Sequence, residues 1–285
     1  MNIDSLYNER FVISFEIFPP KTEAGEESLM QALKELSAYK PGFISVTYGA
    51  GGSTREKTLE LSLKIRDRIG ITPVVHFTCV GSGRREIAEY LRMVKAKRIS
   101  NILALRGDPP QGQERFVPPP DGFSYANELV TYIREIEVFN IGVAGYPEGH
   151  IEAPDLDTDI ANLKKKVDAG ASYIITQLFF SNNDFYIFMD KIRRIGITIP
   201  VIPGIMPITN MAQVKKVTTM CGAKIPPELM SRLLSCDSKD EICEVGIEYS
   251  IAQCRELMQW GIPGFHFYTM NKSTAVKKII DALSL

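Results

Sequence analysis

One carboxyl group lies inside an apolar stretch near the start of the chain. Glu16 is flanked by Phe15, Ile17 and Phe18, so its side chain should be partly removed from water. Removal from water raises the pKa of a carboxyl group and suits it to general-acid catalysis near neutral pH. The same position also suits a strand-end glutamate paired with Arg106 or with a lysine. The residues alone support both interpretations equally.

Further polar side chains fall at the ends of other short apolar runs. Polar groups inside apolar strands are costly to bury without partners, so several of them at matching positions predict a pocket. The set comprises Thr47 and Tyr48, His76 and Thr78, Arg106 and Asp108, Tyr146 and His150, Gln177, and finally His266, Tyr268 and Asn271. We expect these side chains to meet at one end of a barrel.

A stripe of three polar residues is a second candidate site. Asp159, Asn162 and Lys166 are spaced by i, i+3 and i+7, which places them on one face of a helix. An aspartate, an asparagine and a lysine together could hold a ribose, an amide and a phosphate. The spacing alone nevertheless favours an ordinary solvent-exposed face.

Several features argue against other kinds of site. The glycine-rich segment 49–52 follows an apolar run, but it lacks the third glycine and the acidic partner of a dinucleotide-binding fingerprint. The three histidines lack the spacing of metal ligands, and the five cysteines include no CxxC pair. We therefore expect neither a metal site nor a disulfide framework.

Composition narrows the class of protein. The formal net charge of −1 lacks the basic excess of nucleic-acid-binding proteins, and 45% hydrophobic with 24% charged residues is ordinary for a globular chain. Residues 1–10 contain no apolar core of a signal peptide, and no apolar run approaches the roughly 20 residues that span a bilayer. We expect a cytoplasmic protein that binds neither nucleic acid nor membranes.

The elements that would position the polar residues alternate regularly. Eight apolar runs typical of buried strands cover residues 11–18, 43–48, 73–80, 102–105, 141–145, 173–179, 201–205 and 265–268. Between and after them lie helical patterns, at residues 55–69, 86–96, 125–137, 157–169, 184–194, 211–220, 226–234, 239–260 and 275–283. For the first of these we expect Ser53 or Thr54 as N-cap and Gly70 as the residue that ends the helix. This alternation predicts an α/β fold, a (β/α)8 TIM barrel formed by residues 1–285 as a single domain, with a doubly wound open sheet as the alternative. Active sites of such barrels lie at the C-terminal ends of the strands, where the polar residues fall.

Six ordered segments resemble the motifs of one enzyme family. They are residues 14–21, 43–50, 103–108, 144–148 with His150, 175–177 and 266–271. On these motifs the chain resembles the methylenetetrahydrofolate reductases, in a bacterial form with the catalytic barrel only, from about residue 10 to 272. The resemblance implies ping-pong reduction of 5,10-methylenetetrahydrofolate to 5-methyltetrahydrofolate, in one-carbon metabolism and methionine biosynthesis. It also implies FAD as cofactor and NAD(P)H as co-substrate, with NADH favoured.

The resemblance further implies roles for single residues at matching motif positions. Glu16 would protonate the folate, and Asp108 would lie near the flavin and the pterin. The substrate-binding residues would be Gln177, Gln213, Tyr268 and Lys272. The FAD-binding residues would be Thr47, Tyr48, Ala50, His76, Arg106, Gly107, Asp108, Tyr125, Ala126, Ala144, Tyr146, His150, Ala153, Asp159, Asn162, Lys165 and Lys166, a set that includes the helical stripe.

Two positions depart from the family's pattern. Lys272 stands where relatives often carry arginine, and a lysine keeps the charge but loses the two-pronged contact with a carboxylate. Val217 stands where some relatives place an aromatic residue against the substrate. Because the chain stops after the predicted barrel, the resemblance implies no regulatory C-terminal domain and no inhibition by S-adenosylmethionine.

The resemblance also bears on the partners of the protein and on alternative activities. Members of the family form dimers or tetramers, so we expect a homo-oligomer that acts on a small-molecule folate. A protein electron donor in place of nicotinamide is an open alternative. Two other barrel classes are also open: a flavin enzyme like proline dehydrogenase, and a folate-binding methyltransferase that needs no flavin.

Overall fold

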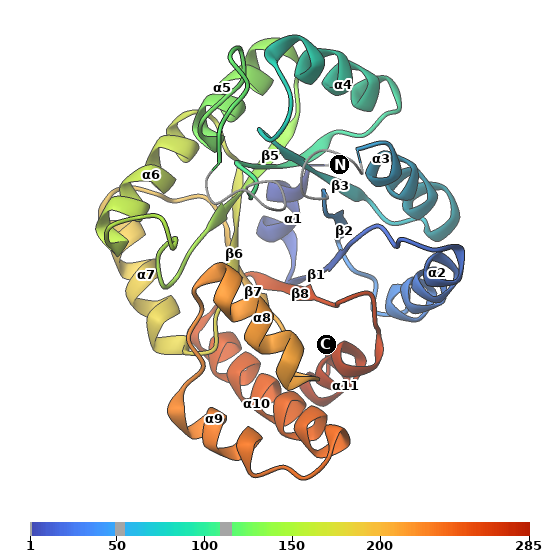
Figure 1. Cartoon of the computed structure of the whole chain (residues 1–285), viewed down its shortest axis with the longest axis vertical. Helices are drawn as coiled ribbons and strands as arrows, with labels where there is room; N and C mark the ends of the chain where they lie inside the picture. Colours follow the sequence, from blue (N-terminus) through green and yellow to red (C-terminus); the bar gives the residue numbers. More distant parts are fainter. Residues whose placement is uncertain (1, 49–54, 109–115) are drawn as a thin grey trace.

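Eight parallel strands form a closed ring in the computed structural model, which describes residues 2–48, 55–108 and 116–285 (Figure 1). The strands are β1 (Val12–Ile17), β2 (Phe43–Val46), β3 (Pro73–Thr78), β4 (Asn101–Leu105), β5 (Asn140–Gly145), β6 (Tyr173–Leu178), β7 (Val201–Ile205) and β8 (Gly264–Tyr268). Each strand pairs with the next, and β1 closes the ring by pairing with β8. The predicted (β/α)8 barrel is confirmed, and the open sheet is wrong because its two edge strands would not pair with each other.

Helices lie around the outside of the ring (Figure 1). They are α2 (Glu23–Ser37), α3 (Arg55–Lys64) continued by the π-helix η2 (Ile65–Ile69), α4 (Arg84–Ala96), α5 (Ala126–Ile136), α6 (Leu156–Asp168), α7 (Asn182–Arg194), α8 (Met211–Cys221), α9 (Pro227–Leu234), α10 (Lys239–Trp260) and α11 (Thr274–Leu283). No helix in the described part of the chain is both long and apolar enough to cross a bilayer.

The helix predicted over residues 55–69 changes its winding at Ile65, where η2 begins. Gly70 ends it with a φ of 77°, as predicted from the tolerance of glycine for the left-handed region. The N-cap expected at Ser53 or Thr54 lies outside the described residues. The π-helical turn has no sequence signature that the apolar periodicity could reveal.

Two layers of apolar side chains hold the barrel together. β3 is buried along its whole length, as a strand covered on both faces must be. Inside the ring, side chains from several strands fill the half of the barrel near the N-terminal ends of the strands: Phe43, Val74, Leu103, Tyr173 and Ile202. Outside the ring, a larger cluster packs the strands against the helices. This filled half leaves the C-terminal mouth as the place for a ligand.

A short helix that the sequence analysis did not assign lies against the filled end of the barrel. In α1 (Ile3–Glu9), Ile3, Leu6 and Tyr7 are buried in the same cluster as the interior strand residues. The side-chain oxygen of Asn140, at the start of β5, accepts a hydrogen bond from the Ile3 amide at 2.9 Å. The helix therefore closes the end of the barrel opposite the mouth.

Candidate active site

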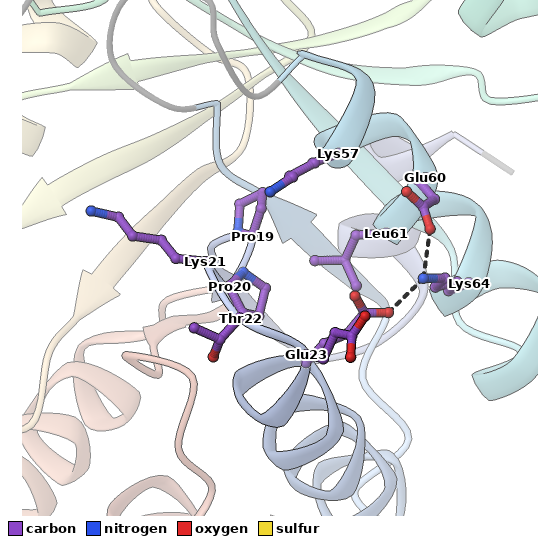
Figure 2. Close-up of a pocket in the computed structure, with 10 residues that line it drawn as sticks. Pro19, Pro20, Lys21, Thr22, Glu23, Lys57, Glu60, Leu61 and Lys64 are labelled. Carbon is purple, nitrogen blue, oxygen red and sulfur yellow. Dashed lines mark hydrogen bonds and ion pairs between the residues drawn. The ribbon is translucent and has the colours of Figure 1, made fainter.

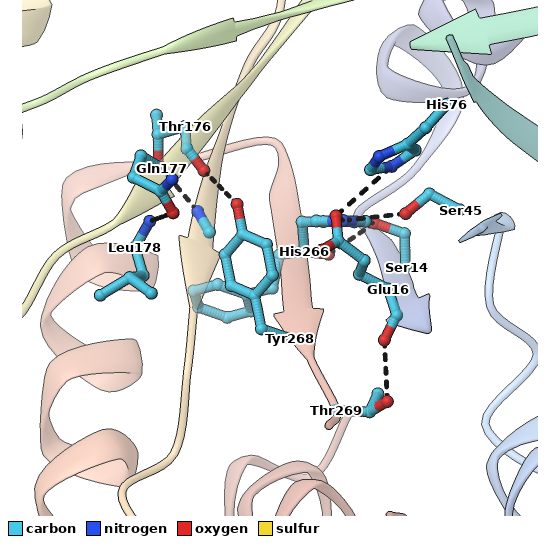
Figure 3. A network of polar contacts seen from close by, with 12 residues as sticks. Ser14, Glu16, Ser45, His76, Thr176, Gln177, Leu178, His266, Tyr268 and Thr269 are labelled. Carbon is cyan, nitrogen blue, oxygen red and sulfur yellow. Dashed lines mark hydrogen bonds and ion pairs between the residues drawn. The ribbon is translucent and has the colours of Figure 1, made fainter. Parts of the chain in front are cut away.

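Glu16 meets two histidines at the mouth of the barrel (Figure 3). Its Oε2 lies 3.4 Å from Nε2 of His76, on β3, and 3.5 Å from Nε2 of His266, on β8. The side chains are 18% exposed for Glu16, 6% for His76 and 0% for His266. Closure of the ring brings these side chains together, since β1 and β8 are at opposite ends of the sequence.

Two serines fix the position of His266. Ser14 Oγ lies 2.8 Å from Nδ1 of the ring, and Ser45 Oγ lies 3.3 Å from Nε2. The ring also stacks on Phe43, with 5.7 Å between centroids and 20° between planes. Sequence reasoning missed Ser14 and Ser45, although Ser14 and Glu16 are two apart in one strand and so share a face.

The pKa of Glu16 is lowered from its usual value, although burial, the largest single influence, raises it. The electrostatic interaction with His76 and the hydrogen bonds with His266 and Ser45 lower the pKa and together outweigh burial. The predicted rise is therefore wrong, because the flanking residues revealed the loss of water but not the polar partners on other strands. The alternative pairing with Arg106 or a lysine is also wrong, since the ion pairs of Glu16 among the described residues are with histidines.

His76 and Thr78 present buried polar atoms at the end of β3. Burial lowers the pKa of His76 to about 4, so the ring is neutral at neutral pH. Oγ1 of Thr78 is buried and has no hydrogen-bond partner among the described residues, and Nε2 of His76 has only its 3.4 Å contact with Glu16. Buried polar atoms are costly without partners, so a polar ligand would satisfy them.

The segment that follows β4 carries an arginine, a glycine and an aspartate. Arg106 binds the carboxylate of Glu152 with both ends of its guanidinium, at 2.5 and 2.6 Å. Gly107 has a φ of 89°, and a Cβ there would lie 2.6 Å from Val80. Asp108 is exposed at the rim. Packing against Val80 and the positive φ therefore require glycine at position 107, and the segment offers an arginine to an anionic ligand.

The polar stripe on α6 splits into two parts. Asp159 is buried, with its pKa raised by burial, while the Lys166 amine donates to the Ala144 carbonyl at 2.6 Å. Burial lowers the pKa of Lys166 to about 8. Asn162 and Lys165 are exposed and bind each other at 2.9 Å. The interpretation of the stripe as a solvent-exposed face is therefore wrong for Asp159 and Lys166, whose side chains turn toward β5.

The loop after β5 packs beside Lys166. Tyr146 and His150 meet edge to face with 4.8 Å between ring centroids. His150 accepts from the Glu152 amide at 3.1 Å, and its backbone carbonyl accepts from the Ala153 amide at 2.9 Å. Glu152, which the sequence analysis did not single out, therefore joins this loop to Arg106 on β4.

The ends of β6 and β8 meet across β7 (Figure 3). The Tyr268 hydroxyl donates to the Thr176 carbonyl at 2.7 Å. A Cβ on Gly204 would lie 2.3 Å from that carbonyl and 2.6 Å from the Tyr268 ring, so only glycine fits between them. The Gln177 side chain accepts from the Leu178 amide at 2.9 Å.

The remaining predicted residues lie farther around the rim. Tyr48 accepts a hydrogen bond from Arg55 at 2.6 Å, an arginine that sequence reasoning missed. Gln213 lies half-buried in the first turn of α8, and Lys272 is exposed after β8. The structure brings neither into contact with the Glu16 cluster. The others on the rim are Thr47, the exposed Tyr125 and Ala126 at the start of α5, whereas Ala50 lies outside the described residues.

A separate hollow of about 210 Å³ lies between α2, α3 and the segment after β1 (Figure 2). Pro19, Pro20 and Leu61 form part of its wall. Lys64 is held there by ion pairs with Glu26 and Glu60. The pair with Glu26 joins α3 to α2, whereas the pair with Glu60 lies within α3, and we assign the hollow no part in the site.

Comparison with known proteins decides between the barrel classes. The family model of methylenetetrahydrofolate reductase matches residues 2–284. The chain belongs to this family. It is 42% identical over 284 residues to methylenetetrahydrofolate reductase (NADH) 1 of Arabidopsis thaliana, with 95% of this chain and 48% of that protein covered.

A bacterial member of the family is similar over more of its length. The chain is 38% identical over 274 residues to 5,10-methylenetetrahydrofolate reductase of Escherichia coli strain K12, covering 96% of this chain and 90% of that protein. The chain thus spans about half the length of the plant relatives and nine tenths of the bacterial one.

A solved structure shares the fold. It is described as an uncharacterized protein from Clostridium thermocellum that binds two copies of 5-methyl-5,6,7,8-tetrahydrofolic acid. It aligns with a TM-score of 0.67 over 98% of this chain and 95% of that chain, at 17% identity. At that identity the likeness establishes the barrel fold alone.

Proposed function

We propose that this protein reduces 5,10-methylenetetrahydrofolate to 5-methyltetrahydrofolate with electrons from NADH. The observation that carries the proposal is a largely buried carboxylate, Glu16, that faces two histidines at the mouth of the barrel, in a chain of the reductase family. Relatives named as NADH-dependent reductases support the choice of donor. The closed ring also supports our view of residues 1–285 as a single catalytic domain.

FAD is the proposed cofactor, and the residues at the mouth fit it. Arg106, which binds Glu152 in this structure, and Lys166 supply positive charge for a pyrophosphate, and the unpartnered hydroxyl of Thr78, with His76 on the same strand, supplies a hydrogen bond. When bound, the flavin would supply hydride transfer between nicotinamide and folate, while the protein supplies position and charge.

The chain's own residues would then act on the folate. Glu16 would deliver a proton to N10, which opens the five-membered ring and leaves a cationic iminium at N5. The carboxylate of Asp108, at the end of β4, would stabilise that cation. Gln177 and Tyr268 would orient the pterin from β6 and β8. Gln213 and Lys272 would hold the far end of the substrate at the rim.

One experiment tests the whole proposal. The purified protein, supplied with FAD, is reduced by NADH without oxygen while its visible spectrum is recorded, and methylenetetrahydrofolate is then added. We expect the flavin spectrum to bleach with NADH and to recover with the folate. A flavin that NADH and NADPH both fail to bleach would point to a protein electron donor. A protein that takes up no FAD would overturn the proposal.

A further inference from the structure

The turn that follows β8 contacts the backbone of the segment that carries Glu16. The Thr269 hydroxyl donates to the Glu16 carbonyl at 2.8 Å, and the Thr269 amide donates to the same oxygen at 3.3 Å (Figure 3). Two residues farther along each segment, the Asn271 side chain accepts from the Phe18 amide at 3.0 Å and donates to the Phe18 carbonyl at 2.8 Å. The turn therefore holds the backbone at Glu16 and again at Phe18.

A carboxamide is the side-chain group that can make both contacts with Phe18. It has one oxygen that accepts and one nitrogen that donates, and the backbone of Phe18 offers the complementary donor and acceptor. The amide of Asn271 therefore has one orientation that fits, with Oδ1 toward the Phe18 N–H and Nδ2 toward the Phe18 carbonyl. An aspartate would instead turn an accepting oxygen toward that carbonyl.

These contacts lie where the sheet no longer holds the chain. The pairing of β1 with β8 ends at Glu16, and its pairing with β2 ends at Ile17. Phe18 lies beyond both, and the two prolines that follow it have no N–H with which to continue a ladder. The side chain of Asn271 therefore supplies the hydrogen bonds that a neighbouring strand would otherwise supply.

The turn adopts an uncommon backbone conformation to reach Phe18. Met270 and Asn271 have φ values of 51° and 60°, in the left-handed region that is costly for most residues other than glycine. The Asn271 amide donates to Thr269 Oγ1 at 3.1 Å, and the Lys272 amide donates to the Thr269 carbonyl at 3.0 Å, which closes the turn. Backbone strain of this kind persists only where the surrounding contacts require it, and it is common at functional sites.

We propose that Asn271 is a positioning residue for Glu16: its carboxamide, with the Thr269 hydroxyl, holds the end of β1 so that the carboxylate faces the folate. This inference rests on the proposed function, in which Glu16 is the acid. The carboxylate contacts His76 and His266, so its backbone and its side chain are held by different elements. Asn271 acts through the backbone and not on the folate. Misplacement of a reacting group by about 1 Å can slow a reaction about 100-fold, which sets the size of the effect.

The two half-reactions separate positioning from general stability. Asn271→Gly removes the carboxamide but keeps a residue that adopts the left-handed conformation easily. In the FAD-loaded protein, we expect reoxidation by saturating methylenetetrahydrofolate to slow about 100-fold, with reduction by NADH nearly unchanged, because only the folate half-reaction uses the acid. Equal slowing of both half-reactions would indicate a structural role and overturn the proposal.

Met270→Gly is the matched control for that variant. It changes the neighbouring left-handed residue but removes none of the hydrogen bonds to Glu16 and Phe18, so both half-reactions should keep wild-type rates. Asn271→Asp then tests the carboxamide at constant size. The aspartate still accepts from the Phe18 amide but repels the Phe18 carbonyl, so the folate half-reaction should slow. Wild-type folate reduction by Asn271→Asp would contradict the role of the carboxamide.

Nitrogen NMR of the FAD-loaded protein with labelled histidine follows the position of the carboxylate without the folate. Of the three histidines in the chain, two face Glu16 and His150 lies in the loop after β5. We expect Asn271→Gly to shift the ring signals of the two that face Glu16, to leave those of His150 in place, and Met270→Gly to shift none. Three unmoved histidines in Asn271→Gly would overturn the proposal. If the wild type reduces its flavin but ignores the folate, the proposed function fails, while the histidine signals still decide whether Asn271 positions Glu16.

Discussion

At the scale of single residues, the position of Glu16 shows why an apolar neighbourhood is an incomplete guide to a pKa. Phe15, Ile17 and Phe18 flank it along the chain, but alternate residues of a strand point to opposite faces. The atoms that Glu16 meets come from other strands: His76 on β3 and His266 on β8. They lower its pKa against the effect of burial. The side chains on the other strands, and not the neighbours along the chain, therefore decide the direction of its pKa shift.

The first prediction concerns Glu16 itself. Glu16→Gln keeps the size of the side chain but removes the acid, so flavin reduction by NADH should be spared. Turnover of methylenetetrahydrofolate should fall by about 100-fold or more, because the amide has no proton to deliver to N10. Stopped-flow measurement of each half-reaction separates the two. Equal loss in both would reject Glu16 as the folate acid.

The second prediction concerns the buried part of the α6 stripe. Asp159→Ala leaves Lys166 buried without its negative neighbour, so the amine should be misplaced or neutral. We expect FAD affinity to fall about tenfold or more, the effect of losing one charge-assisted contact. Flavin content after purification and fluorescence titration measure it. Lys164→Ala, on the same helix but paired with Asp168, is the control. Unchanged flavin affinity in Asp159→Ala would remove this helix from the proposed cofactor site.

At the scale of elements, α1 and the inward-facing side chains of the strands together fill the end of the barrel opposite the mouth. The interior of the barrel below the mouth is filled by strand residues, and Ile3, Leu6 and Tyr7 complete that filling from outside the ring. Asn140 joins the helix to β5 through the Ile3 amide and through Asp4. The helix thus supports the end of the barrel opposite the proposed chemistry.

A third prediction follows from this separation. Leu6→Ala should lower the free energy of unfolding by about 2–5 kcal/mol, because Leu6 is 4% exposed and its removal leaves a cavity. Both half-reactions should continue at nearly wild-type rates in the folded fraction. Urea unfolding followed by circular dichroism provides the measurement. Ser5→Ala, an exposed change in the same helix, should alter stability little; an equal effect of both changes would refute the packing role.

At the scale of the whole molecule, burial of polar groups in the closed ring makes the stability of the folded state depend on pH. His76 has a pKa of about 4 in the folded protein, against about 6.5 when unfolded. As pH falls from 6.5 to 4, His76 becomes protonated in the unfolded chain but stays neutral in the folded protein. Acid therefore stabilises the unfolded chain relative to the folded state across that range. Glu16, with its lowered pKa, also loses stabilisation as pH falls. The mouth of the barrel is therefore acid-sensitive.

The fourth prediction tests that window. His76 alone should account for about 3 kcal/mol of the stability that the flavin-free protein loses between pH 6.5 and pH 4. The variant His76→Gln has no titrating group there, so its free energy of unfolding should fall less steeply with pH. Urea unfolding across this range gives both slopes. Parallel slopes for the wild type and the variant would show that His76 is not held neutral.

The sequence determined the architecture because the required information is local. Runs of apolar residues fix the strands, amphipathic stretches fix the helices, and their alternation fixes a parallel ring, so predicted and observed helix bounds agree within two residues. Six motifs along the chain also fixed the family, which the match over residues 2–284 confirms. The location of the site at the strand ends followed from the barrel rule.

Only the tertiary structure decided which polar groups meet. Glu16 and His266 are 250 positions apart, and their contact exists because β8 closes the ring against β1. The partners of Arg106 and the inward turn of Asp159 likewise depend on neighbours from other elements. Periodicity says which side chains share a face, but burial and charge pairing depend on what packs against that face. The sequence therefore determined the scaffold and its family, and the closed ring determined the protonation states within the site.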